Sequence, residues 1–217
     1  MKINTKTTSR RNFLHYSAGL IGGLELLPDF VDGKNNDPSE NLNIIGPIQG
    51  YSPQIGTFVS MLNWMRNSVL NATKGLTQED LDFLYDKSSN SIGALLLHLA
   101  ATEVVYQDLT FYNLKDYRDE NKKKWSVAMN LGDDGRKEIK GNGLDYYLTN
   151  LKEVREKTLA EFKKRGDKWL TETDPSFFGN HPTNNYCKWF HVCEHEANHR
   201  GQITVIRKRL PGSKGGD

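Results

Sequence analysis

The sequence predicts an all-α protein in which four long helices pack as a bundle. Four segments of roughly 20 residues carry apolar side chains at three- and four-residue spacing, the periodicity of an amphipathic helix. Alternating strand patterns are scarce, and 26% charged with 36% hydrophobic residues is ordinary for a soluble globular protein. Because amphipathic helices must bury their apolar stripes against one another, a four-helix bundle is the most economical architecture.

Residues 1–30 are predicted to be a targeting segment outside the bundle. The run Ser9-Arg10-Arg11-Asn12-Phe13-Leu14 resembles the bacterial twin-arginine export signal, and a mildly apolar run follows it over residues 16–27. That run is too short for a comfortable membrane span. Glu25 and the lack of an Ala-x-Ala site depart from the pattern and leave the cleavage point open. We expect an exported, periplasmic protein with no stable membrane anchor unless the signal is retained. The alternative is a basic N-terminal segment that does not direct export.

The twin-arginine route implies translocation of a protein that is already folded, often with its cofactor bound. Export to an oxidising compartment permits disulfides, yet the chain has only Cys187 and Cys193. Six residues apart on one helix, their Cα atoms would lie about 9 Å apart along the axis, beyond bridging distance. Two free thiols that serve as packing residues are therefore expected.

The first bundle helix is predicted to begin at Ser52-Pro53, a capping residue followed by proline at the first helical position. Residues 31–50 before it, rich in Asn, Asp, Gly and Pro, indicate a linker, so the domain is expected over residues 51–210. The helix should end near Gly75, and residues 76–86 form a connection with a short helical turn at 78–84. Its apolar stripe consists of Ile55, Phe58, Val59, Leu62, Met65 and Val69.

The second helix, expected over residues 91–113, is apolar nearly all round from residue 92 to 101, so it should be central and buried. His98 falls within that run. The charged stretch 116–134, which contains Trp125 and the turn-rich Gly132-Asp133-Asp134-Gly135, is long enough to cross the end of the bundle. The fold therefore includes a long crossover connection between helices two and three.

The third helix is expected over residues 144–165, ended by Gly166, and the fourth from after Thr183 to about Arg209. Residues 211–217 are expected to be a flexible tail. The basic residues 207–209 complement the C-terminus of the fourth helix. With a net charge of +2 and no basic stripe, the chain gives no sign of a nucleic-acid surface.

The fourth helix carries the most informative pattern, because His195 and His199 lie four residues apart. Four residues are about one turn, so both imidazoles leave the same face roughly 6 Å apart along the axis and can close on one metal ion. His191 extends the row, but its outer members diverge by about 80°, so three sequential turns do not readily bind one ion. The third ligand should come from a neighbouring helix. His98 is the only other histidine in a predicted buried helix, since His15 lies in the leader and His181 in a loop.

Two motifs in this order resemble the DinB/YfiT superfamily of four-helix-bundle metalloproteins. They are Asn90-Ser91-Ile92-Gly93-Ala94-Leu95-Leu96-Leu97-His98-Leu99 and His195-Glu196-Ala197-Asn198-His199-Arg200-Gly201-Gln202-Ile203. The resemblance covers roughly residues 50–210, and the order, spacing and helix placement all match. It implies that His98, His195 and His199 bind a divalent cation, with zinc the default and nickel, iron, cobalt or copper as alternatives. Relatives include transferases and isomerases that use low-molecular-weight thiols, along with proposed hydrolases.

Several further residues are candidates for the surroundings of this site. His191 is interpreted either as a pocket residue or as a plain exposed histidine, and Gln202 as a hydrogen-bonding partner near the ligands. Thr102 and Tyr106 share the face of His98, where they line the pocket or simply pack. Gly201 is expected to let a neighbouring helix approach closely.

No catalytic acid or base is assigned from the sequence. Glu194 and Glu196 flank His195, but each is turned about 100° from it, so both are interpreted as surface or helix-pairing charges. Glu103 lies five residues past His98, also off its face.

Three neutral imidazoles with an open position resemble a catalytic site rather than a closed structural one, which normally uses four protein ligands. The favoured function is a metal-dependent enzyme that acts on a small molecule, by thiol transfer or by hydrolysis. The alternatives are a non-catalytic metal-binding or sensing module, in which His191 closes the shell, and a structural or interaction bundle. A homodimer is a mild expectation.

Overall fold

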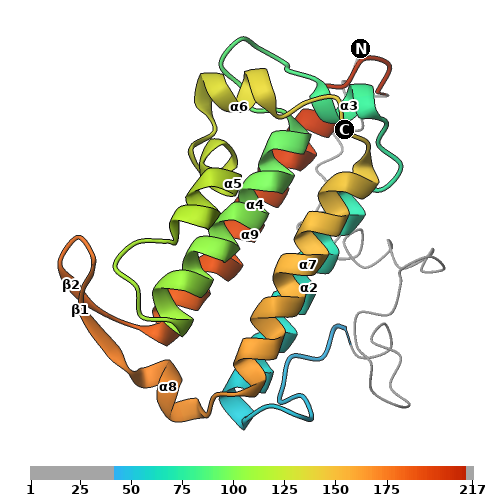
Figure 1. Cartoon of the computed structure of the whole chain (residues 1–217). Helices are drawn as coiled ribbons and strands as arrows, with labels where there is room; N and C mark the ends of the chain where they lie inside the picture. The colour runs from blue at the N-terminus through green and yellow to red at the C-terminus, as the bar shows by residue number, and fades with distance from the viewer. Residues whose placement is uncertain (1–41, 214–217) are drawn as a thin grey trace, which may run out of the picture. The chain divides into compact units, whose positions relative to one another are not determined.

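The structure, a computed structural model, describes residues 42–213 (Figure 1). The proposed signal segment 1–30, most of the linker and the end of the tail lie outside the described residues. The chain divides at Asn43, and the unit that begins at Ile44 holds all the helices described below. The described residues are mostly helical with one small sheet, so the all-α fold class is confirmed.

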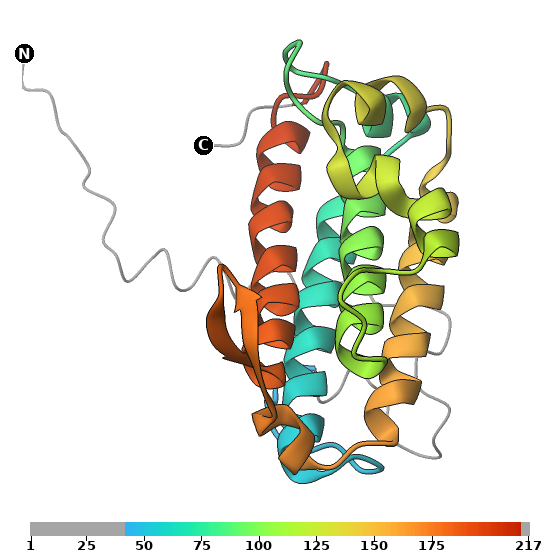
Figure 2. The same cartoon turned by 60° about the vertical axis from the view of Figure 1, so that its left-hand side comes forward.

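Four long helices make the bundle: α2 (Pro53–Thr73), α4 (Ile92–Tyr106), α7 (Leu144–Lys163) and α9 (Asn185–Arg207). Each buries an apolar stripe, and α4 packs against both α7 and α9. Helices α2 and α9 run in one direction and α4 and α7 in the other (Figure 2). Because α4 and α7 share a direction, the chain must return along the bundle between them, which is the long crossover that the sequence predicts.

The helix ends follow local capping chemistry. Ser91 accepts a hydrogen bond from the Ala94 amide at the start of α4, and Asn184 does the same for the Cys187 amide of α9. Ser52 stands at the N-cap of α2 as expected, but its side chain does not cap the helix. Asp167, the first residue of α8 (Asp167–Thr171), instead accepts from the Gln54 and Ile55 amides of α2.

The second predicted helix ends earlier as an α-helix than expected. After Tyr106 the backbone widens into a π-helix, η1 (Gln107–Phe111), whose first two side chains are buried and polar. Gln107 Nε2 donates to the Val154 carbonyl and to Thr158 of α7, both at 2.9 Å. Asp108 accepts from Arg118 and Asn121 in the crossover.

The crossover itself is helical, which corrects the prediction of a charged connection with turns. It forms α5 (Asp119–Asn130) and α6 (Gly132–Glu138), and Trp125 and Ala128 of α5 are buried. The supposed turn at residues 132–135 is the start of α6. The chain breaks between the two helices at Leu131 and Gly132, both of which have positive φ.

A small β-hairpin between α8 and α9 was not predicted. Strand β1 (Thr173–Phe178) pairs antiparallel with β2 (His181–Asn184), so His181 lies in a strand rather than a loop. Gly179 and Asn180 both have positive φ at the tip, as a two-residue hairpin turn requires.

The short connection after α2 does contain the predicted helical turn, α3 (Gln78–Asp82). Both cysteines are free, as expected, but only Cys193 is buried while Cys187 is exposed, so Cys187 is not a packing residue. Over residues 42–213, no helix is both long and apolar enough to cross a membrane.

Candidate metal centre

Three histidine side chains from two bundle helices meet at one point. His98 projects from α4, and His195 and His199 project from successive turns of α9. The Nε2 atom of His195 lies 3.3 Å from Nε2 of His98 and 3.1 Å from Nε2 of His199. One ligand atom from each residue lies within 4.8 Å of the others. The structure thus brings together the three residues that the resemblance names as ligands.

Hydrogen bonds on the far side of two rings fix their orientation. The Nδ1 atom of His98 lies 2.9 Å from the Ala128 carbonyl, which only accepts, so Nδ1 carries the proton. Ala128 is in the last turn of α5, where backbone carbonyls lack partners within the helix. His199 Nδ1 lies 3.2 Å from Gln202 Oε1, and the Gln202 amide nitrogen donates to Asn198. Both rings therefore turn an unprotonated Nε2 towards the cluster, the tautomer that binds a metal.

The electrostatic environment keeps the three rings neutral. The pKa of His195 is lowered to about 3, first by burial and then by the neighbouring His199 and His98. Burial, and next His98, lower the pKa of His199 to about 4, and burial also lowers the pKa of His98. Neutral imidazole is the form that coordinates a cation.

The same geometry leaves the cluster short of hydrogen-bond donors. The Nε2 lone pairs of His98 and His199 both face Nε2 of His195, which can donate to at most one of them. A divalent cation between the three nitrogens would satisfy all of them at once. The donor set therefore fits a metal ion of the kind that imidazole prefers.

The comparison with protein families agrees with this geometry. The family model described as mycothiol S-transferase matches residues 57–212, which include nearly all of the bundle and all three histidines. The chain belongs to the mycothiol S-transferase family. This is a DinB/YfiT-like family, so the superfamily expected from the sequence is confirmed. A search of curated proteins found no match.

His191 lies beside the three-histidine cluster of this family member without joining it. Its ring centroid is 5.7 Å from that of His195, and its Nδ1 lies 2.9 Å from a carboxylate oxygen of Glu194. The side chain is 40% exposed, and its nitrogens are not part of the convergent group found among the described residues. His191 is thus half-buried beside the cluster and paired with an acid.

An aromatic wall continues from His191 away from the cluster. The ring of Phe178 on the hairpin packs 5.5 Å from His191, and Tyr106 lies 5.8 Å from it on the α4 side. Phe177 in turn packs 5.9 Å from Tyr106. Burial raises the pKa of Tyr106 well above its usual value, so its hydroxyl stays protonated. The Thr102 hydroxyl donates a hydrogen bond to the Met129 sulfur, with the two atoms 3.9 Å apart.

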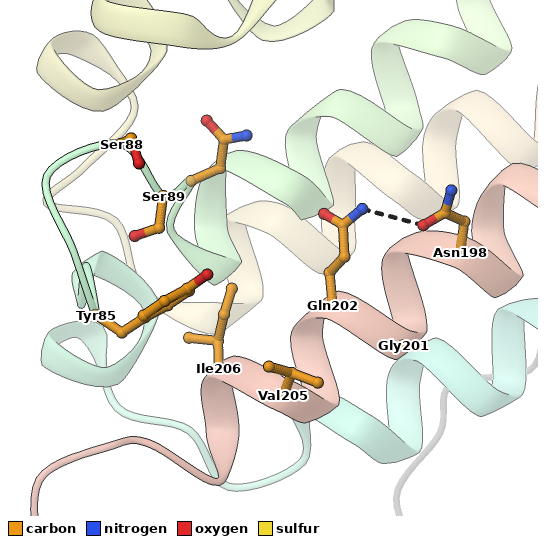
Figure 3. Close-up of a pocket in the computed structure, with 9 residues that line it drawn as sticks. Tyr85, Ser88, Ser89, Asn198, Gly201, Gln202, Val205 and Ile206 are labelled. Atoms are coloured by element: carbon orange, nitrogen blue, oxygen red, sulfur yellow. Dashed lines mark hydrogen bonds between the residues drawn. The ribbon is translucent and has the colours of Figure 1, made fainter.

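Gly201 does not serve the purpose that the sequence suggested. A Cβ added to it would meet nothing within 4 Å, so no neighbouring helix approaches closely there. It instead lines an open pocket of about 490 Å³ between α9 and the segment that precedes α4 (Figure 3). Asn198 and Gln202, which flank His199 on α9, line the same pocket. Gln202 therefore connects the pocket to the histidine cluster.

Glu196 is a buried charge that pairs helices, the second of the two interpretations that the sequence left open. It is buried in an ion cluster to which each bundle helix contributes one residue: Arg66 (α2), Glu103 (α4), Arg155 (α7) and Glu196 (α9). Glu196 Oε1 lies 2.6 Å from both arginines, and Glu103 lies 2.9 Å from Arg66 and 2.7 Å from Arg155. We call these residues the four-helix ion cluster.

The four-helix ion cluster holds the Glu103 carboxylate charged. Burial by itself raises the pKa of Glu103, but the charges of Arg155 and Arg66 outweigh it, so the pKa lies below the usual value. Each guanidinium also donates to a backbone carbonyl, Arg66 to Leu151 and Arg155 to Leu62. Because Glu103 and Glu196 are both engaged by arginines, neither is free to accept a proton from a substrate.

Proposed function

We propose that the protein is a metal-dependent transferase that attaches a low-molecular-weight thiol to a small electrophilic molecule. One observation carries the proposal: three neutral imidazole nitrogens converge between α4 and α9 in a chain of a thiol-transferase family. Three protein ligands are the number found in catalytic metal sites, whereas closed structural sites use four.

The chain's own residues would hold and tune the cation. His98, His195 and His199 would be its ligands, while the Ala128 carbonyl and Gln202 orient two of the rings. Zinc is the expected ion, with nickel, iron, cobalt and copper as alternatives for a histidine-only set. A divalent cation held there is a Lewis acid that lowers the pKa of a thiol or a water molecule at its open position. The side chains of His98 and His199 are buried, so two of the three ligands are shielded from water.

The direct experiment compares two histidine variants. We expect His195→Ala to stay folded but to lose zinc binding and conjugation of a thiol to a fluorogenic alkylating agent. The matched control is His181→Ala, which removes an exposed histidine of the hairpin and should keep both properties. Folded His195→Ala protein with unchanged zinc content and turnover would refute the proposal. Ester or amide hydrolysis without any thiol would assign the site to the hydrolase alternative instead.

Export is a second, separate proposal that rests on Arg10 and Arg11 alone. We expect a reporter fused behind residues 1–41 to reach the bacterial periplasm in a folded state. Replacing both arginines by lysine should keep the charge but abolish transport. Equal transport of the two fusions would contradict the twin-arginine interpretation.

A further inference from the structure

The β-hairpin beside α9 is the feature that the metal site does not explain. Its strands β1 and β2 lie against the N-terminal half of α9 (Figure 2). Most of their side chains are exposed, and Phe177 is the strand residue that packs against a hydrophobic cluster of the bundle. The hairpin therefore adds little to the core, and its position next to the histidines calls for another explanation.

An irregularity in β1 turns two successive phenylalanines towards the helices. The strand pairing shifts between Asp174 and Phe178, where β1 holds extra residues relative to β2. Successive side chains of a regular strand point to opposite faces, so Phe177 and Phe178 would not both meet the helices without this bulge. Phe177 packs 5.9 Å from Tyr106 of α4, and Phe178 packs 5.5 Å from His191 of α9. Bulges that redirect a side chain in this way are over-represented next to active sites.

A buried lysine of α9 fixes the bulge in place. The Lys188 side chain is only 4% exposed, and its Nζ lies 3.1 Å from an Asp174 carboxylate oxygen and 4.1 Å from the centre of the Phe177 ring. Asp174 and Phe177 flank Pro175 and Ser176, so one ammonium group holds both ends of the bulge. Taking an ammonium group out of water is costly unless it is compensated, and here a carboxylate and an aromatic face do so. A specific interaction therefore sets the position of the hairpin on α9.

Phe178 presents an exposed aromatic surface beside the metal centre. The residue is 38% exposed, although its ring meets His191 edge-on. The ring centroid of His191 lies 5.7 Å from that of His195, one of the three ligands. Ring contacts thus run without a break from the hairpin to the histidine cluster.

The ionisable groups along this wall are paired or neutral. Glu194 pairs with His191, and Asp174 pairs with Lys188. Burial raises the pKa of Tyr106 well above its usual value, so its phenol carries no charge. A ligand that lies against the wall therefore meets aromatic faces and no unpaired charge.

We propose that the hairpin is the wall against which the acceptor molecule binds, with Phe178 as its specificity-determining residue and Lys188 as the residue that positions it. The inference rests on the proposed function, because the acceptor is the electrophile of the transfer reaction. An uncharged, planar aromatic electrophile fits this wall, since it gains ring contacts with Phe178 and His191 that an aliphatic electrophile lacks.

Two uncharged acceptors with one thiol test this preference in the zinc-loaded protein. 2-Mercaptoethanol displaces chloride from 1-chloro-2,4-dinitrobenzene or from 2-chloroacetamide: a sulfur–carbon bond forms, chloride leaves with the bonding electrons, and the thiol proton passes to the buffer. Phe178→Ala should raise the KM for the aromatic acceptor about tenfold and that for 2-chloroacetamide by no more than about twofold. The matched control is Phe190→Ala, which removes a ring that is 56% exposed and lies one residue, about 100°, from His191 on α9. It should leave both KM values unchanged.

Two variants of Lys188 test its positioning role. Lys188→Met keeps an apolar side chain but removes the ammonium group between α9 and the hairpin, so it should raise the KM for the aromatic acceptor selectively, as Phe178→Ala does. Lys188→Arg should restore most of the affinity, because a guanidinium group can keep both the ion pair and the ring contact. An equal effect of Lys188→Met on both acceptors, without rescue by arginine, would overturn the positioning role.

A binding measurement without turnover separates this inference from the proposed function. 1,3-Dinitrobenzene, which lacks the chloride, should shift the ring NMR signals of Phe178 and His191 in the zinc-loaded and the metal-free protein, and those of Phe190 should not move. Such shifts with no turnover of any thiol would support the aromatic wall and count against the transferase. Turnover without such shifts, or with the same KM values in the wild-type protein and Phe178→Ala, would keep the transferase and overturn the inference.

Discussion

The histidine cluster and the four-helix ion cluster are neighbours on α9, since His195 belongs to the first and Glu196 to the second. In the ion cluster, two guanidinium groups meet two carboxylates and two backbone carbonyls, so the charges cancel within the protein. In the histidine cluster, three nitrogens face one another with too few protons to pair them. The first balances its charges and links all four bundle helices, although Glu196 Oε2 is buried without a hydrogen-bond partner among the described residues, whereas the donor set of the second fits a cation. One buried polar cluster thus pairs its charges within the protein, and the adjacent one is the candidate metal site.

Breaking the ion cluster should have the largest effect on stability. Glu196→Ala leaves Arg66 and Arg155 buried without one of their two carboxylates, so we expect the free energy of unfolding to fall by about 3–5 kcal/mol. Urea unfolding followed by circular dichroism measures this change. Glu194→Ala, which removes the half-exposed carboxylate two residues before it, is the control and should cost little. A loss below about 1 kcal/mol for Glu196→Ala would show that the ion cluster is not structural.

At neutral pH, removing a histidine should affect stability only when metal is present. At a zinc concentration about 1,000 times the dissociation constant, the wild-type protein should gain about 4 kcal/mol, and His195→Ala should lose that gain. Without metal the two proteins should unfold at nearly the same urea concentration, because the cluster satisfies few of its own hydrogen bonds. A large destabilisation of metal-free His195→Ala would place this histidine with the structural residues instead.

The hydrogen bond between Gln202 and His199 should have a smaller effect, and that effect should be on zinc affinity. Gln202→Leu removes the acceptor that fixes the His199 tautomer, so zinc affinity should fall about 10- to 100-fold while the free energy of unfolding changes little. Competition with a chromogenic zinc chelator measures the affinity. Thr204→Ala, two residues further along α9, is the control. Unchanged affinity in Gln202→Leu would show that this hydrogen bond does not tune the site.

Acid should distinguish the two clusters through their pKa shifts. The pKa of His195 is about 3 in the folded protein and 6.5 for an ordinary histidine. At a pH between these two values, His195 therefore binds a proton in the unfolded chain but not in the folded protein. Stability of the metal-free protein should therefore decrease as the pH falls below about 6.5, and less so in His195→Ala. The ion cluster should respond only at lower pH, because the pKa of Glu103 lies below 4.5. Identical pH profiles of the two proteins would contradict this assignment.

The sequence predicted what depends on periodicity and spacing. The four bundle helices follow apolar stripes, and the three histidines meet because α4 and α9 are neighbours, as the resemblance implied. Helices α5 and α6 were missed because their surfaces are mostly charged and only a few residues, such as Trp125 and Ala128, are buried. The hairpin was missed because β1 has no apolar alternation, although Gly179-Asn180 is a recognised turn signal.

The ion cluster could not be read from single charges, because an isolated Glu or Arg is usually exposed. A signal was nevertheless present. Arg66 and Arg155 each follow a buried apolar residue of a helix stripe, and Glu103 lies in a helix that is otherwise nearly uncharged. Two cations and two anions on the inward faces of four helices indicate mutual neutralisation, but their pairing depends on tertiary structure alone.

The most direct test of the open three-histidine site is X-ray absorption spectroscopy of the zinc-loaded protein and of its His191→Ala variant. The account predicts three imidazole ligands, with nitrogen at about 2.0–2.1 Å, in both proteins. Four imidazoles in the wild-type protein and three in His191→Ala would contradict it, because His191 would then close the shell and leave no position for a thiol.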